Sequence, residues 1–514
     1  MSVDELFPSF GQKEKELSLL DRIVTAQEKS AGITPGFSDL EIGLISGIVS
    51  NRTGKVWKRK VYKTASNSSS TCPALDSNAE GVASPFTDTA AGSDPYMDNY
   101  RVFKWSHCNY TRDSDGTARI SALDGMPGYA STGSADVGTV LPTFYWAYNE
   151  HDTYYELIFS DSPHEELGLV PWCMAVKSDG TVLPYFVVSS YASIVASDGK
   201  LRSQPGKPAN NASYDNNVTN YQAKGSGYWG GGLNINTLCL IYLIIKYQTK
   251  NESYIFQGNN TFYKSVAIAY AETGTKRALV AAGSGFQVGD GVTIGAKDSC
   301  WLNGSLVSWA KVLKVESVSI SGTTYDAVTL DVSAAFDTTT ALYLCGSACP
   351  SGQTDAVIGH YDGSYLSNTD AKHAFRIEGI EMMNGLWNVA SDTVFDFLAD
   401  SWRVYVADKG TAHVKDAHTG YRLIGTCDAF KNDQWVGNVM MDLASGAFYH
   451  KDVGSGSSLG TGAHHWNGGT GVTDGTLREC RSLGNLTDGS RGGLCDLHGR
   501  TALSAAYVDL GSRD

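Results

Sequence analysis

The chain has 514 residues, a formal net charge of −14 and a hydrophobic content of 42%. This length predicts several domains, each large enough to bury a core. The acidic balance argues against a nucleic-acid partner, because such binding depends on Lys and Arg side chains that meet phosphate. The 56 glycines and 27 tyrosines favour short strands and turns over helical packing.

Targeting signals are not evident. Residues 1–20 are charged and lack the apolar stretch of a secretory signal peptide. The longest apolar run, residues 238–245, is too short for a bilayer, which needs about 20 residues. We expect synthesis in the cytoplasm without a signal peptide, and no membrane insertion.

The first 95 residues predict a segment for attachment or oligomerisation. Residues 17–24 have a helical pattern, and a second apolar stretch follows at 40–49. Residues 55–63 alternate like a strand, whereas residues 64–95 are rich in Ser, Thr, Asn and Gly and predict a long exposed loop.

Residues 96–264 predict the first part of an α+β domain. Its expected helix is the apolar segment 234–250, which Asn236 and Thr237 can cap. The glycine run 225–232 before it lacks the Gly-Lys-Ser/Thr of a phosphate loop, so a tight turn is favoured. Short aromatic strands are expected at 100–105, 143–148, 154–159 and 183–188.

Residues 265–362 predict a small all-β domain inserted into the larger one. Residues 286–294 and 325–332 alternate as strands between Gly and Asp turns. The parent pattern resumes over 363–514, with strands expected at 375–380 and 402–406.

The ten cysteines are scattered, and none forms a Cys-x2-Cys pair with matching histidines. We therefore expect buried free thiols, no metal site and no cofactor. Calcium is not predicted either, because no clear motif of carboxylate and Asn ligands is present.

Three ordered motifs resemble one fold family. Residues 375–389 (FRIEGIEMMNGLWNV), 489–494 (GSRGGL) and 508–513 (VDLGSR) are similar to stretches of the C-type-lectin-like fold shared by formylglycine-generating enzymes and phage tropism proteins. The resemblance covers roughly residues 100–514 without the inserted β-domain. It implies a C-type-lectin-like α+β domain that the β-domain interrupts.

Within that fold, residues 490–513 resemble the C-terminal segment of variable proteins diversified by retroelements. In those proteins, constant scaffold residues alternate with positions that mutate. The resemblance implies a scaffold that includes Arg491, Gly492, Gly493, Leu494, Ala502, Leu503, Gly511 and Arg513. It implies a ligand-binding set of Asp496, His498, Arg500, Thr501, Ser504, Tyr507 and Asp509.

The resemblance implies a receptor-binding, tropism-determining tail protein of a phage or prophage, located on the virion and not an enzyme. Its expected partners are a host cell-surface protein or glycan, other virion proteins and two further copies of the chain in a homotrimer. Tyr507, His498, Arg500 and Trp466 would anchor the ligand.

Other interpretations stay open at this point. The C-terminal segment could be a plain strand that closes a sheet, and the protein could be a structural or decoration component of a virion. A copper oxidase of the formylglycine-generating type is disfavoured, because Cys495 follows the Arg-Gly-Gly turn without a second suitable cysteine and Cys480 lies in the wrong place.

Two further catalytic interpretations have weaker support. Glycan hydrolysis could use a carboxylate pair, for which the candidates are Asp152, Glu156, Glu165 and Glu166. His464 and His465, with Asp442 and Asp474, could bind a metal, but an exposed loop is the favoured interpretation of the histidine pair.

Overall fold

The computed structural model describes residues 41, 43 and 47 and most of residues 51–514. The gaps are 64–70, 80, 86, 88–91, 257, 259–262, 297–303, 337–341, 358–360, 367–369, 371, 429–432, 455–460 and 467–470. The helical pattern expected at 17–24 lies outside the described residues. The described part is α+β and consists mostly of strands. None of its helices has the length and apolar sequence needed to cross a bilayer.

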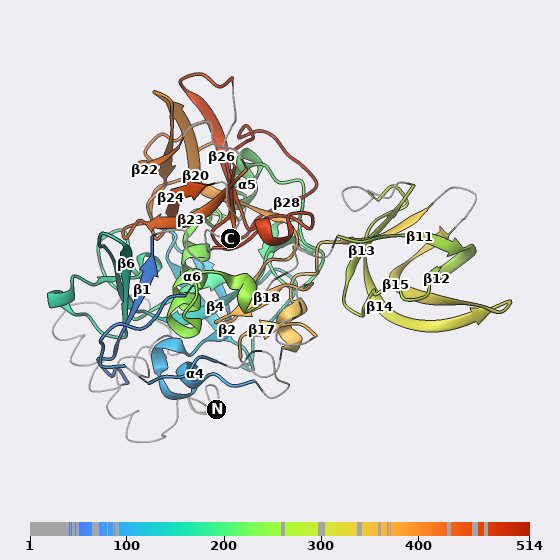
Figure 1. Cartoon of the computed structure of the whole chain (residues 1–514), viewed down its shortest axis with the longest axis horizontal. Helices are drawn as coiled ribbons and strands as arrows, with labels where there is room; N and C mark the ends of the chain where they lie inside the picture. Colours follow the sequence, from blue (N-terminus) through green and yellow to red (C-terminus); the bar gives the residue numbers. More distant parts are fainter. Residues whose placement is uncertain are drawn as a thin grey trace.

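Two antiparallel sheets form the first half of the main body (Figure 1). The first has the order β1 (Val56–Tyr62), β6 (Tyr154–Ser160), β5 (Tyr145–Glu150), β7 (Val170–Pro171). The second has the order β3 (Ala118–Leu123), β2 (Ser106–Arg112), β4 (Asp136–Pro142), β8 (Tyr185–Ser189), and β9 (Ser193–Val195) pairs separately with β10 (Leu201–Ser203). The aromatic strands predicted at 143–148, 154–159 and 183–188 are thereby confirmed.

Helix α6 (Asn234–Tyr247) is the hydrophobic centre of the main body. Its sequence is apolar on every side, which is the pattern of a fully buried helix. Leu238 and Ile241 are inaccessible and belong to one cluster with aromatic side chains such as Trp57 and Phe159. The predicted helix is confirmed, but the predicted cap is wrong, because Asn236 and Thr237 lie inside the helix and Leu233 precedes it without a side-chain cap. The helix ends where Gln248 takes a left-handed conformation with φ of 55°.

Shorter helices connect the sheets. Asp94 caps α4 (Pro95–Asn99) and Ser213 caps α5 (Tyr214–Gln222), each through a side-chain oxygen that accepts from backbone N–H groups. The described 3-10 turns are η3 (Arg101–Phe103), η4 (Glu165–Leu167), η5 (Cys173–Ala175), η6 (Glu252–Tyr254), η8 (Gln353–Ala356) and η10 (Gly489–Arg491).

Two local predictions in this half are wrong. The strand expected at 100–105 is the turn η3, because the Lys104 N–H bonds to the nearby Arg101 carbonyl instead of to a neighbouring strand. The loop expected at 64–95 is not exposed throughout, because Cys72 is inaccessible and its N–H donates to the Gln248 carbonyl.

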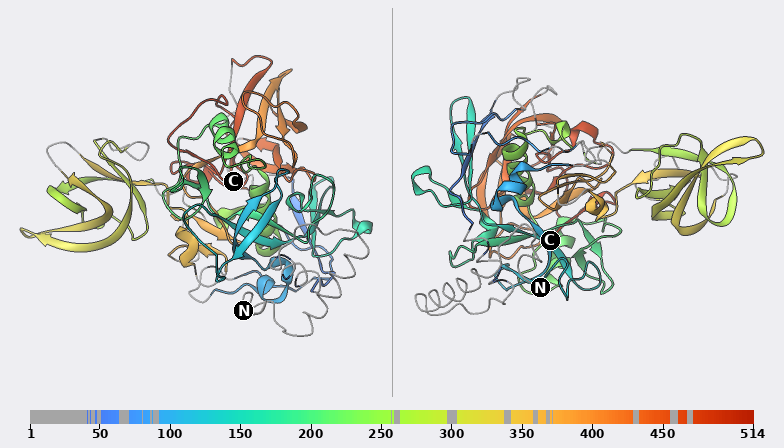
Figure 2. Two further views of the ribbon diagram at one scale, coloured as in Figure 1. Left: turned by 180° about the vertical axis from the view of Figure 1, so that it is seen from behind. Right: turned by 90° about the horizontal axis from the view of Figure 1, so that it is seen from below.

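A closed barrel lies within the segment for which the sequence predicts an inserted β-domain. Its order is β11 (Ser265–Tyr270), β12 (Glu272–Ala281), β15 (Thr323–Phe336), β14 (Val307–Ile320), β13 (Gly291–Gly295), β16 (Tyr343–Ser347). Ser265 lies opposite Cys345, so the chain enters and leaves the barrel at one place. The barrel has its own hydrophobic cluster and projects from the main body in every view (Figures 1 and 2).

The cysteines mostly follow the expectation of buried thiols. The eight described free cysteines are all buried. Cys345 of the barrel is instead disulfide-bonded, which the scattered spacing did not predict.

The second half of the main body is dominated by a large sheet. Its path runs β22 (Arg422–Asp428), β21 (Ser401–Val406), β20 (Trp387–Leu398), β26 (Thr476–Ser482), β27 (Leu497–His498), β25 (His464–Trp466), β23 (Gln434–Met441), β24 (Phe448–Gly454), and β28 (Leu510–Gly511) pairs with β20. A smaller sheet has the order β17 (Gly363–Ser364), β18 (Phe375–Ile377), β19 (Ile380–Met382).

The prediction of an exposed loop at the histidine pair is wrong. His464 and His465 lie in strand β25, and both are about 2% exposed. Strand β25 pairs with β23 and β27, which are distant in sequence, so the local composition could not reveal the strand.

Candidate functional site

The C-terminal loop, residues 499–509, connects two strands that are fixed in the large sheet. Strand β27 pairs with β25 and β26 before the loop, and β28 runs parallel to β20 after it. Leu503, in the middle of the loop, is buried in a cluster with Trp387 and Leu510. The loop is therefore held at both ends and at its centre, although its backbone is irregular.

The structure separates the predicted ligand-binding residues into three groups. Arg500, Ser504 and Tyr507 are exposed on the C-terminal loop. His498, Thr501 and Asp509 are half-buried. Asp496 is inaccessible, so its prediction as a displayed residue is wrong.

The backbone before β27 explains the burial of Asp496. The Asp496 N–H bonds to the Gly493 carbonyl in a tight turn, and the chain then enters the sheet at Leu497. Burial and the nearby Asp488 raise the pKa of Asp496 well above its usual value. This side chain belongs to the interior and is held as a neutral acid.

Tyr507 is the largest exposed side chain of the C-terminal loop. Its side chain is 49% exposed, and the guanidinium carbon of Arg481 lies 5.3 Å from its ring centroid. Arg481 in turn forms an ion pair with Glu479, and the Glu479 N–H donates to the Thr501 carbonyl at 2.9 Å. Strand β26 thus fixes both the backbone of the loop and its main aromatic group.

His498 lies between two indole rings beside the loop. The ring centroids of Trp387 and Trp466 lie 5.0 and 5.8 Å from that of His498. Burial, together with Arg481 and Arg500, lowers the pKa of His498 to about 3. The imidazole is therefore neutral near pH 7 and adds a flat, uncharged aromatic group to this surface.

Some of the predicted scaffold residues are buried and others are exposed. Arg513 is buried and donates to the carbonyls of Ser189 in β8 and Glu381 in β19. Gly492 and Gly493 are buried, and a Cβ on Gly493 would lie 2.2 Å from Glu252 Oε1. Arg491 and Ala502 are exposed instead, and the Arg491 guanidinium lies 3.8 Å from Asp433.

Sequence reasoning missed Arg481 and Trp387, which support the loop. Both lie on strands that meet residues 497–511 only through long-range pairing. The residues next to them in the sequence do not indicate that they contact the C-terminal loop.

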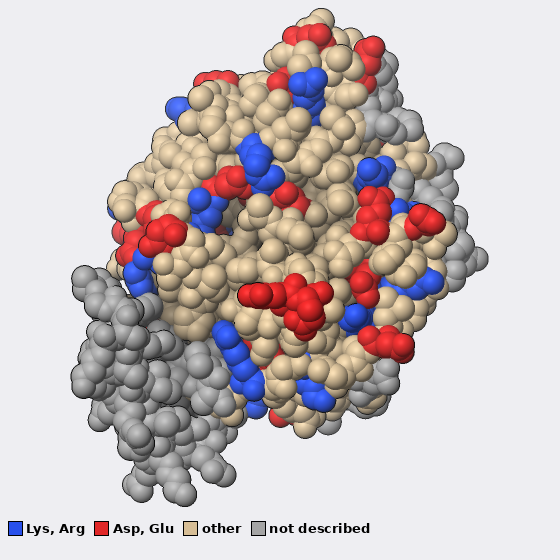
Figure 3. All heavy atoms as spheres, turned by 90° about the vertical axis from the view of Figure 1, so that its left-hand side faces the viewer, with Lys and Arg blue, Asp and Glu red and all other residues tan. Residues whose placement is uncertain are grey.

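Charge is dispersed on one face of the molecule. On the face drawn in Figure 3, Lys and Arg side chains lie among Asp and Glu side chains rather than in one basic patch. This distribution gives phosphate groups no continuous basic track among the residues that the structure describes on that face.

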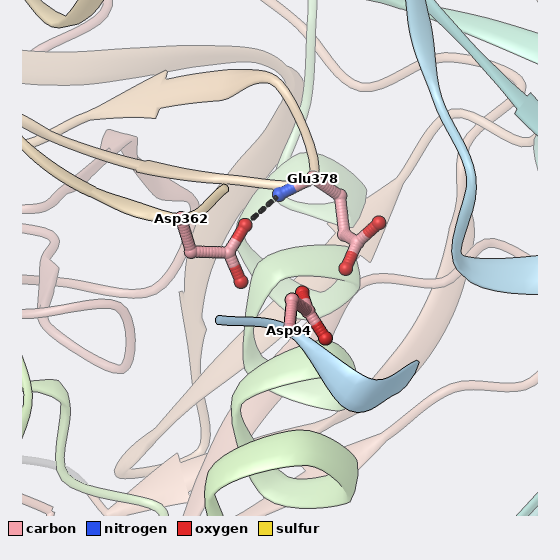
Figure 4. Close-up of side chains that lie close together, drawn as sticks. All are labelled: Asp94, Asp362 and Glu378. Carbon is pink, nitrogen blue, oxygen red and sulfur yellow. Dashed lines mark hydrogen bonds between the residues drawn. The ribbon is translucent and has the colours of Figure 1, made fainter. Parts of the chain in front are cut away.

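A carboxylate cluster lies elsewhere, in the core. Asp94, Asp362 and Glu378 point toward one another beside α6 (Figure 4). Lys246 Nζ lies 2.5 Å from Asp94 and 2.7 Å from Asp362, and it also pairs with Glu378. The ammonium group occupies the position that a metal would need, so this cluster is a structural ion pair network.

The other sequence candidates do not converge on a site. Asp442 forms an ion pair with Arg422, and Glu156 lies 3.7 Å from Lys58. Cys480 and Cys495 are buried thiols, and burial raises the pKa of each. Protonated thiols are poor ligands for copper.

The remaining carboxylates named in the sequence lie at the surface. Glu166 pairs with His164 on an exposed turn, and Glu165 and Asp152 are exposed as well. Asp474 accepts a hydrogen bond from the Ala399 N–H at a hairpin.

Comparison with known proteins adds no family. No protein-family model matches the sequence, and no curated protein matches it.

Proposed function

We propose that the chain is a receptor-binding protein of a phage or prophage virion, and that the C-terminal loop is its ligand-binding surface. The observation that carries this proposal is the arrangement of Arg500, Ser504 and Tyr507 at the surface of a loop anchored by buried Leu503. Rigid scaffolds that carry exposed aromatic and polar side chains are typical of binding loops.

The chemistry of the loop favours binding over catalysis. Tyr, Trp and Arg dominate the energetic centres of protein interfaces. The carboxylates beside the loop are engaged: Glu479 pairs with Arg481, and Asp509 accepts from Asn485 Nδ2 at 2.8 Å. A general acid and base pair would need carboxyl groups that reach a substrate.

We further propose that the main body has the C-type-lectin-like fold and belongs with retroelement-diversified variable proteins. The motif at 375–389 contacts the terminal motif in space, which supports this assignment. Trp387 pairs with Leu510, and the Glu381 carbonyl accepts from Arg513.

The expected ligand is a protein or glycan on the host cell surface. A homotrimer, present in many copies on each virion, would supply avidity to a weak single site. The barrel, which stands apart from the main body, is available for contacts with other virion proteins.

The test compares particles that carry the natural chain with particles that carry Arg500→Ala, Ser504→Ala and Tyr507→Ala together. We expect adsorption to host cells to fall at least tenfold while particle assembly and the melting temperature of the chain stay unchanged. These substitutions are preferable to a deletion of the segment, which would remove buried Leu497 and Arg513.

The matched control replaces Lys311, Ser321 and Tyr270 by Ala, because these side chains are exposed on the barrel. The proposal requires that this variant adsorb normally. Normal adsorption of the loop variant would contradict it, and defective assembly of that variant would favour a structural virion protein.

A further inference from the structure

A cavity of about 110 Å³ lies in the main body. Strand β8, the glycine run and residues 407–409 contribute to its wall. Its lining includes Arg112, Phe186, Trp229, Asp392, Lys409 and His413. None of the predicted ligand-binding residues lines this cavity, so the cavity is separate from the C-terminal loop.

The glycine run forms a fixed wall because side chains would not fit there. A Cβ on Gly230 would lie 2.3 Å from Ser391 Oγ, and one on Gly232 would lie 1.6 Å from Asp392 Oδ2. The Gly231 N–H donates to the Arg513 carbonyl at 2.7 Å. The backbone of the run is thereby held against β20 and the terminal segment, as the predicted tight turn requires.

Lys409 brings a partly buried cation to the cavity, and the Asp115 carboxylate is near enough to favour its charged form. Its Nζ donates to the Met174 carbonyl at 2.9 Å, and no carboxylate among the described residues forms an ion pair with it. Two other charged groups of the wall are already paired, Arg112 with Asp514 and Asp408 with Arg422. An incoming anion would therefore find Lys409 available.

Asp392 brings a buried acceptor. Its carboxylate accepts from Thr393 Oγ1 at 2.6 Å and from the backbone N–H of Leu233, and burial raises its pKa to about 6. His413 adds a second acceptor. Its Nδ1 lies 2.7 Å from the Trp229 carbonyl and must donate to it, which leaves Nε2 with a lone pair in the neutral ring.

The wall also includes apolar area. Phe186 lines the cavity, and the Trp229 ring lies 6.0 Å from that of His413. A small site with aromatic lining and a few polar groups is the usual form of a small-molecule pocket.

We propose that this cavity binds a small carboxylic acid that also carries a hydroxyl or ammonium group. The carboxylate would pair with Lys409, the donor group would bond to Asp392 or His413, and the carbon skeleton would lie against Trp229 and Phe186. Acidic sugars and free amino acids share this chemistry. The inference does not depend on the receptor-binding function, because it uses other residues.

The test is calorimetric titration of the full chain at pH 7 with glucuronate and with serine. Glucose and ethanolamine are the controls, because each keeps hydroxyl or amine groups but lacks the carboxylate. We expect one acid to bind while its counterpart without a carboxylate does not, and the acid that binds shows whether the ligand is an acidic sugar or an amino acid. Binding by neither acid, or equal binding of the counterpart without a carboxylate, would overturn the proposal.

Lys409→Met tests the assigned cation. We expect this variant to bind the acid at least tenfold more weakly, whereas Lys311→Met on the exposed barrel surface binds it normally. Unchanged affinity of Lys409→Met would refute the assignment.

A measurement on the natural chain covers the case in which the variant does not fold. Lysines are labelled by reductive methylation with ¹³C, and the acid is added. We expect the signal of Lys409 to shift, and the affinity to fall as pH rises from 7 to 9.5, because burial lowers the pKa of Lys409 to about 8. A stationary signal would contradict the proposal.

Discussion

Lys246 lies on helix α6 with its ammonium group among the carboxylates of Asp94, Asp362 and Glu378. All four side chains are buried. A buried ion pair loses stability when one partner is removed, because the remaining charges stay without compensation. This cluster joins α4, α6 and the β18–β19 turn, so it connects elements from three parts of the sequence.

Replacement of Lys246 by Met tests this role. We expect a loss of about 3–5 kcal/mol in the free energy of unfolding, measured by urea denaturation. The control is Lys314→Met, since the Lys314 side chain is 62% exposed in its ion pair with Glu316 and should contribute below about 1 kcal/mol. A stable Lys246→Met protein would show that the carboxylates do not need the ammonium group.

The buried side chain of Glu252 predicts that the stability of the folded chain depends on pH. Burial raises the pKa of Glu252 to about 8, whereas the unfolded side chain titrates near about 4.3. The folded state therefore keeps a proton that the unfolded chain releases. Stability falls as pH rises from about 4.3 to about 8, by on the order of 1.4 kcal/mol per unit from this group.

Glu252→Gln removes the proton release while keeping the shape of the side chain. We expect the variant to be more stable than the natural chain at pH 8 and to show a smaller fall in melting temperature between pH 5 and 8. Parallel melting curves for the two proteins across this range would contradict the assignment.

Asp496 shows the limit of residue-level prediction. The resemblance placed it in the displayed set with Arg500 and Tyr507, and the structure buries it. The sequence pattern shows which residues alternate, but the side that faces solvent depends on pairing with β25 and β26, which come from elsewhere in the chain.

Elements with strong local patterns were predicted from sequence. The apolar run at 238–245 identifies α6, and aromatic alternation identifies β5 and β6. Elements that depend on distant partners, such as β25, were not predicted from sequence. Its histidine-rich sequence resembles a loop until residues 434–435 and 497–498 pair with it.

The contact between barrel and main body includes a histidine. His373 Nε2 lies 2.9 Å from Asp290, which precedes β13, and Nδ1 contacts Asp370. Burial alone would lower the pKa of His373, but hydrogen bonds to Asp290 and Asp370 outweigh it and raise the pKa to about 9. The stabilisation that charged His373 gives this contact is fully present below about pH 6.5 and is lost as pH rises through about 9.

We therefore expect the base of the barrel to exchange amide hydrogens faster at pH 10 than at pH 7, after correction for the intrinsic rate. His373→Ala should show the faster exchange already at pH 7. Equal protection of the natural chain and the variant at pH 7 would mean that other contacts hold the barrel.

The whole molecule combines a buried framework with an exposed C-terminal loop. Arg513 links the terminal segment to β8 and β19, and Leu503 anchors the loop beneath its displayed residues. Substitution of exposed positions on such a framework changes the binding surface without changing the fold. The sequence motifs indicated this segment, but only the structure separates its exposed positions from its buried ones.

We propose that this fixed framework carries exchangeable surface residues. The most direct measurement is to sequence the encoding locus from many virions or cells of one lineage. We predict substitutions at the codons of His498, Arg500, Thr501, Ser504, Tyr507 and Asp509, matched by adenines in a nearby repeat beside a reverse transcriptase, with the buried Asp496 constant. An invariant segment without a repeat, or substitutions as frequent at Asp496 and Leu503 as at the exposed positions, would contradict the account.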